Sequence, residues 1–139
     1  MLLIAPLVRR NLQGTHHFVA IGPDDAARAP KLPLLEGESI VGWYQNPPPD
    51  RSSVAFTDRA LLVVNGDDAL RLSYRDMTSW RANAEDQGEV TGLFVRCADE
   101  WVSIPFAGRR GPDGADVDAY KLATILSAVI RTPRDKLLA

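Results

Sequence analysis

The stretch Ser53–Met77 reads SVAFTDRALLVVNGDDALRLSYRDM, and it decides the fold class of this chain. Two short apolar runs flank the polar turn Thr57–Arg59, and a Gly-Asp-Asp corner leads into a third run in which apolar and polar residues alternate. Alternation of this kind is typical of a strand with one buried face. The stretch therefore predicts a three-stranded antiparallel meander, which needs neighbouring elements to cover its apolar face.

Further strands are predicted on both sides of this meander, because runs rich in β-branched and aromatic residues favour strands. In the run Trp101–Phe106 the even positions carry Val, Ile and Phe, so we expect these to face the core and Trp101 to face away from it. Gly92 predicts a bulge or the close approach of another backbone. The predicted strands outside the meander are His16–Ile21, Ser39–Gln45, Met77–Arg81, Val90–Cys97 and Trp101–Phe106.

One amphipathic helix is predicted near the C-terminus, over residues 116–131. Asp116 is a good N-cap, and Pro133 ends the helix. The charged tail Arg134–Lys136 is expected to be frayed. Apolar residues recur at the spacing i, i+3, i+4 and i+7, and they form one stripe that covers the sheet. The residues of this stripe are Leu122, Ile125, Leu126 and Val129.

The first part of the chain leaves several alternatives open. Met1–Val8 is compatible with a first strand, with an apolar arm on the domain and with a partly ordered tail. Asp24–Ala29 predicts a single helical turn. The strand pattern becomes clear only from Ser39 onward. We therefore divide the chain into residues 1–34, an N-terminal arm or extension packed on the domain, and residues 35–139, the domain itself.

Composition indicates an ordinary globular protein with one domain. The 139 residues are 45% hydrophobic and 24% charged, and the net charge is −2. This charge gives no general attraction to nucleic acid or to an anionic membrane. Because Cys97 is the only cysteine, we expect a reducing, cytoplasmic setting and a thiol buried in a strand.

Three short motifs carry a family resemblance. Glu36–Glu38 precedes the first clear strand, Phe56–Val63 spans a Thr-Asp-Arg turn, and Tyr74–Met77 follows the third strand of the meander. Over Leu35 to Arg131 the chain resembles bacterial pleckstrin-homology-like (PH-like) and GRAM-like domains. The resemblance implies a mainly β (α+β) fold, namely a strongly bent antiparallel sheet or partly open barrel of about seven strands, capped by one C-terminal helix. Members of these families are mostly binding modules for lipid headgroups, peptides or protein partners.

The chain departs from the members that bind phosphoinositides. Those members resemble one another in a basic cluster around the loop after the first strand. Here that loop is Asn46–Arg51, which contains three prolines and one arginine beside Asp50, and we expect it to be exposed. Asp67 and Asp68 in the next hairpin would repel a headgroup. We therefore predict no phosphoinositide site.

Catalytic, cofactor and metal sites are not predicted. His16 and His17 are adjacent, and adjacent residues of a strand point to opposite faces, so they cannot readily share a metal. The pairs Asp58–Arg59 and Arg75–Asp76 lie at turns, where Asp typically accepts hydrogen bonds from the backbone. We expect Glu36–Glu38 to be a solvated turn.

The favoured hypothesis is a non-enzymatic binding or assembly module that recognises a protein or peptide, or self-associates, through an open sheet edge or an aromatic patch. Trp80 and Trp101 are the candidate partner surface. The alternative is a peripheral membrane adaptor that binds anionic lipid, with Arg109 and Arg110 as candidate contacts. A small-molecule enzyme is the third and least favoured reading. The other basic residues of the membrane alternative are Arg9, Arg10, Arg131, Arg134 and Lys136.

Overall fold

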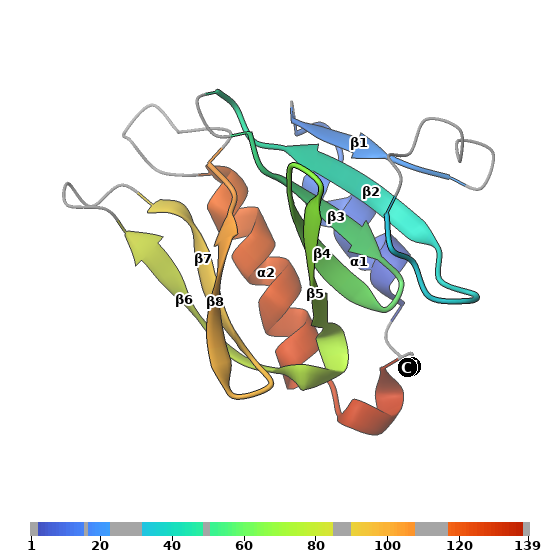
Figure 1. The fold of residues 1–139 in the computed structure, drawn as a ribbon. Helices are drawn as coiled ribbons and strands as arrows, with labels where there is room; N and C mark the ends of the chain where they lie inside the picture. Colours follow the sequence, from blue (N-terminus) through green and yellow to red (C-terminus); the bar gives the residue numbers. More distant parts are fainter. Residues whose placement is uncertain are drawn as a thin grey trace.

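The computed structural model describes residues 3–15, 17–22, 32–48, 51–84, 90–107 and 117–137. Within these ranges the strands form a five-stranded sheet in the order β1-β2-β3-β4-β5 and a three-stranded sheet in the order β6-β7-β8 (Figure 1). The elements are α1 (Ile4–Leu12), β1 (Phe18–Ala20), β2 (Ile40–Gln45), β3 (Ser53–Thr57), β4 (Ala60–Asn65), β5 (Asp68–Ser73), η2 (Tyr74–Asp76), β6 (Met77–Ala84), β7 (Val90–Cys97), β8 (Glu100–Pro105), α2 (Val117–Arg131) and η3 (Arg134–Lys136).

The predicted meander is present as β3, β4 and β5, and all strand pairs in both sheets are antiparallel. The mainly β, α+β class is confirmed. The finer description, a strongly bent sheet or partly open barrel of about seven strands capped by one helix, stays a prediction. In the described part of the chain, eight strands divide into two separate hydrogen-bonded ladders, and two α-helices accompany them. The division falls at η2, a 3-10 turn whose buried Tyr74 ends the meander.

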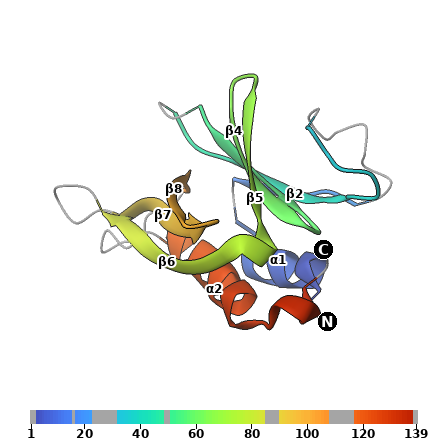
Figure 2. The ribbon, with the colours of Figure 1, turned by 60° about the horizontal axis from the view of Figure 1, so that its bottom comes forward.

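The two helices cover the inner faces of the two sheets. α1 packs against β2 and β3, α2 packs against β6 and β7, and the helices contact each other (Figure 2). Between them lies one apolar cluster with residues from both sheets. At its centre the ring of Tyr44 from β2 stacks on Phe106, with centroids 3.6 Å apart, and Phe56 meets Phe106 edge-on. The cluster therefore joins the two sheets into one core.

The first helix corrects the predictions for Met1–Val8. In place of a strand or a partly ordered tail, residues Ile4–Leu12 form the helix α1, which packs on the domain. Ile4, Leu7, Val8 and Leu12 share one face at the spacing i, i+3, i+4, i+8, and all four belong to the core cluster. Proline lacks an N–H, but in the first turn of a helix that donor has no partner within the helix, so Pro6 is tolerated.

The C-terminal segment is also more ordered than expected. α2 ends at Arg131, and η3 follows it where a frayed tail was predicted. Leu137 is buried, and Arg134 donates hydrogen bonds to the backbone carbonyls of Tyr74 (3.2 Å) and Met77. This charged tail is thus attached to the corner between the two sheets. The predicted cap Asp116 and the predicted turn Asp24–Ala29 lie outside the described residues.

Two strand-level predictions can be compared with the structure. A Cβ at Gly92 would overlap the carbonyl oxygen of Ile104 on the neighbouring strand, which confirms the predicted close backbone approach. Asn46, by contrast, was placed in an exposed loop but is only 2% exposed. Neither helix in the described ranges has the length and apolar composition that a membrane-spanning helix requires.

Candidate functional site

Strand β6 is an edge strand that lies beside α2. It pairs with β7 on one side, and no strand among the described residues pairs with its other side (Figure 1). The backbone N–H and C=O groups of such an edge that point away from the sheet can pair with another extended chain. Strand β6 is eight residues long, Met77–Ala84, so this edge can form several such hydrogen bonds.

Trp80 presents an aromatic ring at this edge. It pairs with the buried Val95 of β7, so its side chain lies on the α2 side of the sheet. The indole N–H donates a hydrogen bond of 2.8 Å to Oγ of Ser127 on α2, while 36% of the residue stays exposed. The ring is therefore held in one orientation with part of its apolar surface in solvent.

The exposed stripe of α2 continues this surface. Tyr120 is 59% exposed, and Thr124 and Ser127 follow it at the spacing i+4 and i+7, which places the three residues on one side of the helix. Ser127 binds Trp80, so this side of α2 is the one that faces β6. We call the surface formed by Thr78, Trp80, Ala82, Tyr120, Thr124 and Ser127 the β6–α2 surface.

Trp101 lies on the opposite face of the three-stranded sheet. It pairs with Arg96, one position from Val95 on β7, and is 43% exposed. The guanidinium of Arg81 lies over its ring, 4.7 Å from the centroid, and 5.1 Å from the centroid of Phe94. The prediction that Trp101 faces away from the core is confirmed. However, the structure does not bring Trp80 and Trp101 together in one patch.

The arginines of the membrane alternative are only partly described. Arg109 and Arg110 lie outside the described residues. Of the others, Arg9 donates to the carbonyl oxygen of Ile21 (3.1 Å), and Arg134 holds the corner after β5. These two side chains therefore stabilise the main chain.

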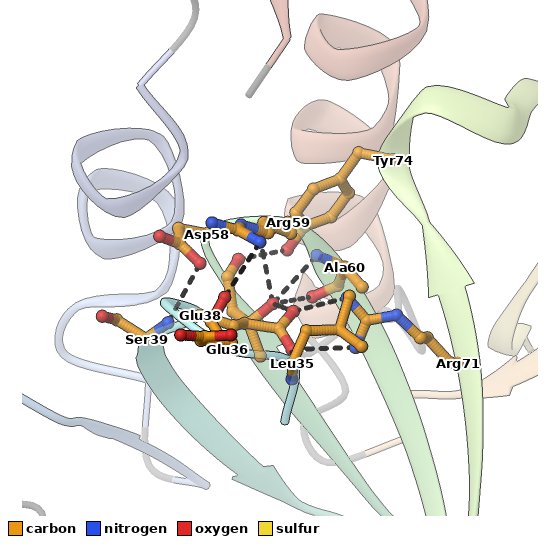
Figure 3. A network of polar contacts seen from close by, with 10 residues as sticks. Leu35, Glu36, Glu38, Ser39, Asp58, Arg59, Ala60, Arg71 and Tyr74 are labelled. Atoms are coloured by element: carbon orange, nitrogen blue, oxygen red, sulfur yellow. Dashed lines mark hydrogen bonds and ion pairs between the residues drawn. The ribbon is translucent and has the colours of Figure 1, made fainter. Parts of the chain in front are cut away.

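A polar network lies at the start of β2 (Figure 3). The carboxylate of Glu38 accepts hydrogen bonds from the backbone N–H of Leu35 (2.9 Å), from Oγ1 of Thr57 (2.6 Å) and from both terminal nitrogens of Arg71 (2.8 and 2.7 Å). Burial by itself raises the pKa of Glu38, but these hydrogen bonds together lower it from 4.5 to about 2. A fully bonded carboxylate with so low a pKa is a poor proton acceptor, so it serves to attach the segment before β2 to the sheet.

This network corrects the expectation that Glu36–Glu38 is a solvated turn, because the Glu38 side chain is completely buried. The neighbouring Asp58 accepts a hydrogen bond from the backbone N–H of Ser39 (3.1 Å), as expected for an aspartate at a turn. The hydroxyl of the buried Tyr74 donates to the carbonyl oxygen of Thr57 (2.9 Å), and burial raises its pKa. Here the polar side chains hold strands together.

Cysteine and histidine form no metal cluster in the part of the chain that the structure describes. Cys97 is buried, as predicted, and its thiol lies 3.7 Å from the carbonyl oxygen of Ser73. Burial and the nearby charge of Asp76 raise the pKa of this thiol, which reduces the thiolate fraction that a nucleophile needs. His17 lies near the ring of Tyr44, and His16 is outside the described residues.

Several residues of these surfaces were not singled out from the sequence. Tyr120, Thr124 and Ser127 could have been found as the stripe opposite the apolar face of the predicted helix. The contact between Arg81 and Trp101 depends on the register of three strands, which the sequence does not specify. No protein-family model, characterised protein or solved structure significantly matches this chain.

Proposed function

We propose that this chain is a non-enzymatic binding module with a PH-like arrangement of strands, which binds an extended peptide segment of a protein partner along β6. The observation that carries the proposal is the edge of β6 that pairs with no strand in the described part of the chain, beside the exposed rings of Trp80 and Tyr120. Among the described residues, only the carbonyl oxygen of Met77, at the start of β6, is already bonded there, to Arg134. A peptide added to a sheet edge gains affinity from main-chain hydrogen bonds and specificity from its alternate side chains.

The order of elements supports the PH-like part of the proposal. Four consecutive antiparallel strands, β2 to β5, are followed by three more, β6 to β8, and then by α2. This is the order that the resemblance implies for residues 35–139. α1 and β1 precede it and add a helix and an edge strand that the resemblance does not include.

The β6–α2 surface suits a peptide for two reasons. Every second side chain of an added strand would point towards α2, where Trp80 and Tyr120 offer apolar contact area. In addition, the hydrogen bond to Ser127 already fixes the Trp80 ring, so little side-chain freedom is lost on binding. A large, partly fixed aromatic ring at a surface is typical of a residue that contributes strongly to binding.

The test begins with a random-sequence peptide display library selected on the full chain. The strongest peptide is then measured by fluorescence anisotropy against wild type and against Trp80→Ala, Tyr120→Ala and Trp101→Ala. We expect Trp80→Ala to weaken binding by about tenfold or more, because it removes the central ring. Trp101→Ala is the matched control on the other face, and it should leave the affinity unchanged.

Hydrogen exchange locates the bound peptide. Peptide addition should protect amides of β6, residues 77–84, more than those of β8, and circular dichroism should show each variant to be folded. The proposal is overturned if no peptide is enriched, or if the enriched peptide protects another part of the chain and binds Trp80→Ala as well as wild type.

A further inference from the structure

We propose that the outer face of the three-stranded sheet is a second recognition surface, which binds an acidic segment of a protein partner through the guanidinium of Arg81. This face is formed by alternate residues of β6, β7 and β8 and points away from α2. It does not include the β6–α2 surface, so the inference does not depend on peptide addition to β6. Its residues are Ser79, Arg81, Asn83, Phe94, Arg96, Trp101 and Ser103.

Rings on the two other strands of this sheet, β7 and β8, hold Arg81 in place. Its partner across the ladder is Phe94, and its guanidinium carbon lies 5.1 Å from that ring centroid and 4.7 Å from the centroid of Trp101. A guanidinium over an aromatic face is stabilised electrostatically and keeps the N–H donors in its own plane available. Two rings thus position this side chain before any ligand arrives.

Arg81 has no acceptor for these donors among the described residues. Other arginines of the chain do: Arg71 binds the carboxylate of Glu38, and Arg9 and Arg134 bind backbone carbonyls. Arg81 is exposed, makes no ion pair and donates no hydrogen bond within the described ranges. An immobilised, uncompensated guanidinium is a ready receptor for an anion.

The charge of this face favours acidic partners. Arg96 is the second cation on it, and among the described residues it pairs with Asp99, 3.8 Å away in the β7–β8 turn, whose side chain is 92% exposed. The three strands place no Asp or Glu among the outward-facing residues. Electrostatic complementarity therefore selects a negatively charged segment.

Carboxylate groups match the face better than phosphates. One unpaired guanidinium provides the fork that binds a carboxylate in bidentate geometry. A phosphate-rich ligand needs several convergent cations, and here Arg96 is already shared with Asp99. The exposed ring of Trp101 adds apolar area beside the charge. The occupant is therefore an acidic protein segment in which Asp or Glu alternates with apolar residues.

The experiment uses the full chain and two fluorescein-labelled decapeptides, one alternating Asp and Leu and the other alternating Asn and Leu. We expect the acidic peptide to bind with an affinity that falls as salt rises, and the amide peptide to bind at least tenfold more weakly. Arg81→Gln should reduce the affinity for the acidic peptide at least tenfold. Arg75→Gln, an exposed arginine outside this face, is the matched control and should leave it unchanged.

Two further measurements make the result decisive. Backbone NMR shifts caused by the acidic peptide should centre on Ser79, Phe94 and Trp101, with Tyr120 unaffected, and Trp101→Ala should weaken binding because it removes one of the two rings. Equal binding of both peptides, full affinity in Arg81→Gln, or tighter binding of a poly-uridine RNA than of the acidic peptide would each overturn the proposal. Failure of the β6 peptide test alone would leave it standing.

Discussion

Glu38 contributes to stability through its charge, and its pKa gives the sign of the effect. Because the folded-state pKa of about 2 lies below the ordinary value of 4.5, its contribution is complete above about 4.5 and is lost as the pH falls towards 2. We expect Glu38→Gln to lower the free energy of unfolding by about 2 kcal/mol near neutral pH. The difference from wild type should shrink as the pH falls below about 4. Urea denaturation at a series of pH values measures both the loss of stability and its change with pH.

Glu36→Gln is the matched control, since Glu36 is exposed and its side chain makes no described hydrogen bond. It should change stability by less than about 0.5 kcal/mol at any pH. If Glu38→Gln is equally neutral, or if its effect does not depend on pH, then the ionised Glu38 carboxylate does not stabilise the fold through the hydrogen bonds that the distances indicate.

Residue-level features differ in how far they could be predicted. The close approach at Gly92 follows from one glycine inside a strand pattern, which is local information. Glu38 can be buried because its carboxylate accepts hydrogen bonds from Thr57 and Arg71, which lie 19 and 33 positions away in the sequence. A short Glu-Gly-Glu segment is usually a solvated turn, and only the folded register of β5 brings Arg71 to it.

At the level of elements, α1 behaves as part of the core. Leu7 is 4% exposed and belongs to the cluster that joins both sheets. We expect Leu7→Ala to lower the free energy of unfolding by about 3 kcal/mol, because it removes buried methyl groups and leaves a cavity. Leu3→Ala is the control: Leu3 is 63% exposed, and its loss should cost less than about 0.5 kcal/mol. Equal effects in thermal denaturation would mean that α1 does not pack on the domain in solution.

The strands were easier to predict than this helix. Alternation and turn residues mark β2 to β8 directly, whereas α1 begins within the run LLIAPLV, where nearly every residue is apolar and the helical period is hard to see. Pro6 does not preclude this helix, because a proline is tolerated in the first turn. The signal that was available is the spacing of Ile4, Leu7, Val8 and Leu12.

At the scale of the whole molecule, the α+β class could be predicted, but the break in strand pairing between β5 and β6 could not. A meander, three later strands and a helix are all compatible with one bent sheet. The turn at η2 ends the first ladder, and the stacking of Tyr44 on Phe106 then brings the two inner faces together. Contacts between sheets involve residues far apart in the sequence, which short patterns do not encode.

Asn46 forms side-chain hydrogen bonds that link the two sheets. It follows β2, and its amide nitrogen donates to the carbonyl oxygen of Pro105 at the end of β8 (2.9 Å), while its carbonyl oxygen accepts from the backbone N–H of Ala107 (2.9 Å). Asn46→Asp keeps the shape of the side chain but replaces this donor by a buried charge that faces a carbonyl oxygen. We expect the free energy of unfolding to fall by about 3 kcal/mol near neutral pH.

The pH dependence of this variant identifies the cause. Burial and the facing carbonyl raise the pKa of the introduced aspartate, so its stability should recover partly as the pH falls and the protonated carboxyl regains a donor. Asn65→Asp, at the exposed end of β4, is the control and should cost less than about 1 kcal/mol. Amide exchange then separates two outcomes. Faster exchange in both sheets means that they unfold as one unit joined at Asn46, whereas faster exchange in β6 to β8 alone would contradict a single core.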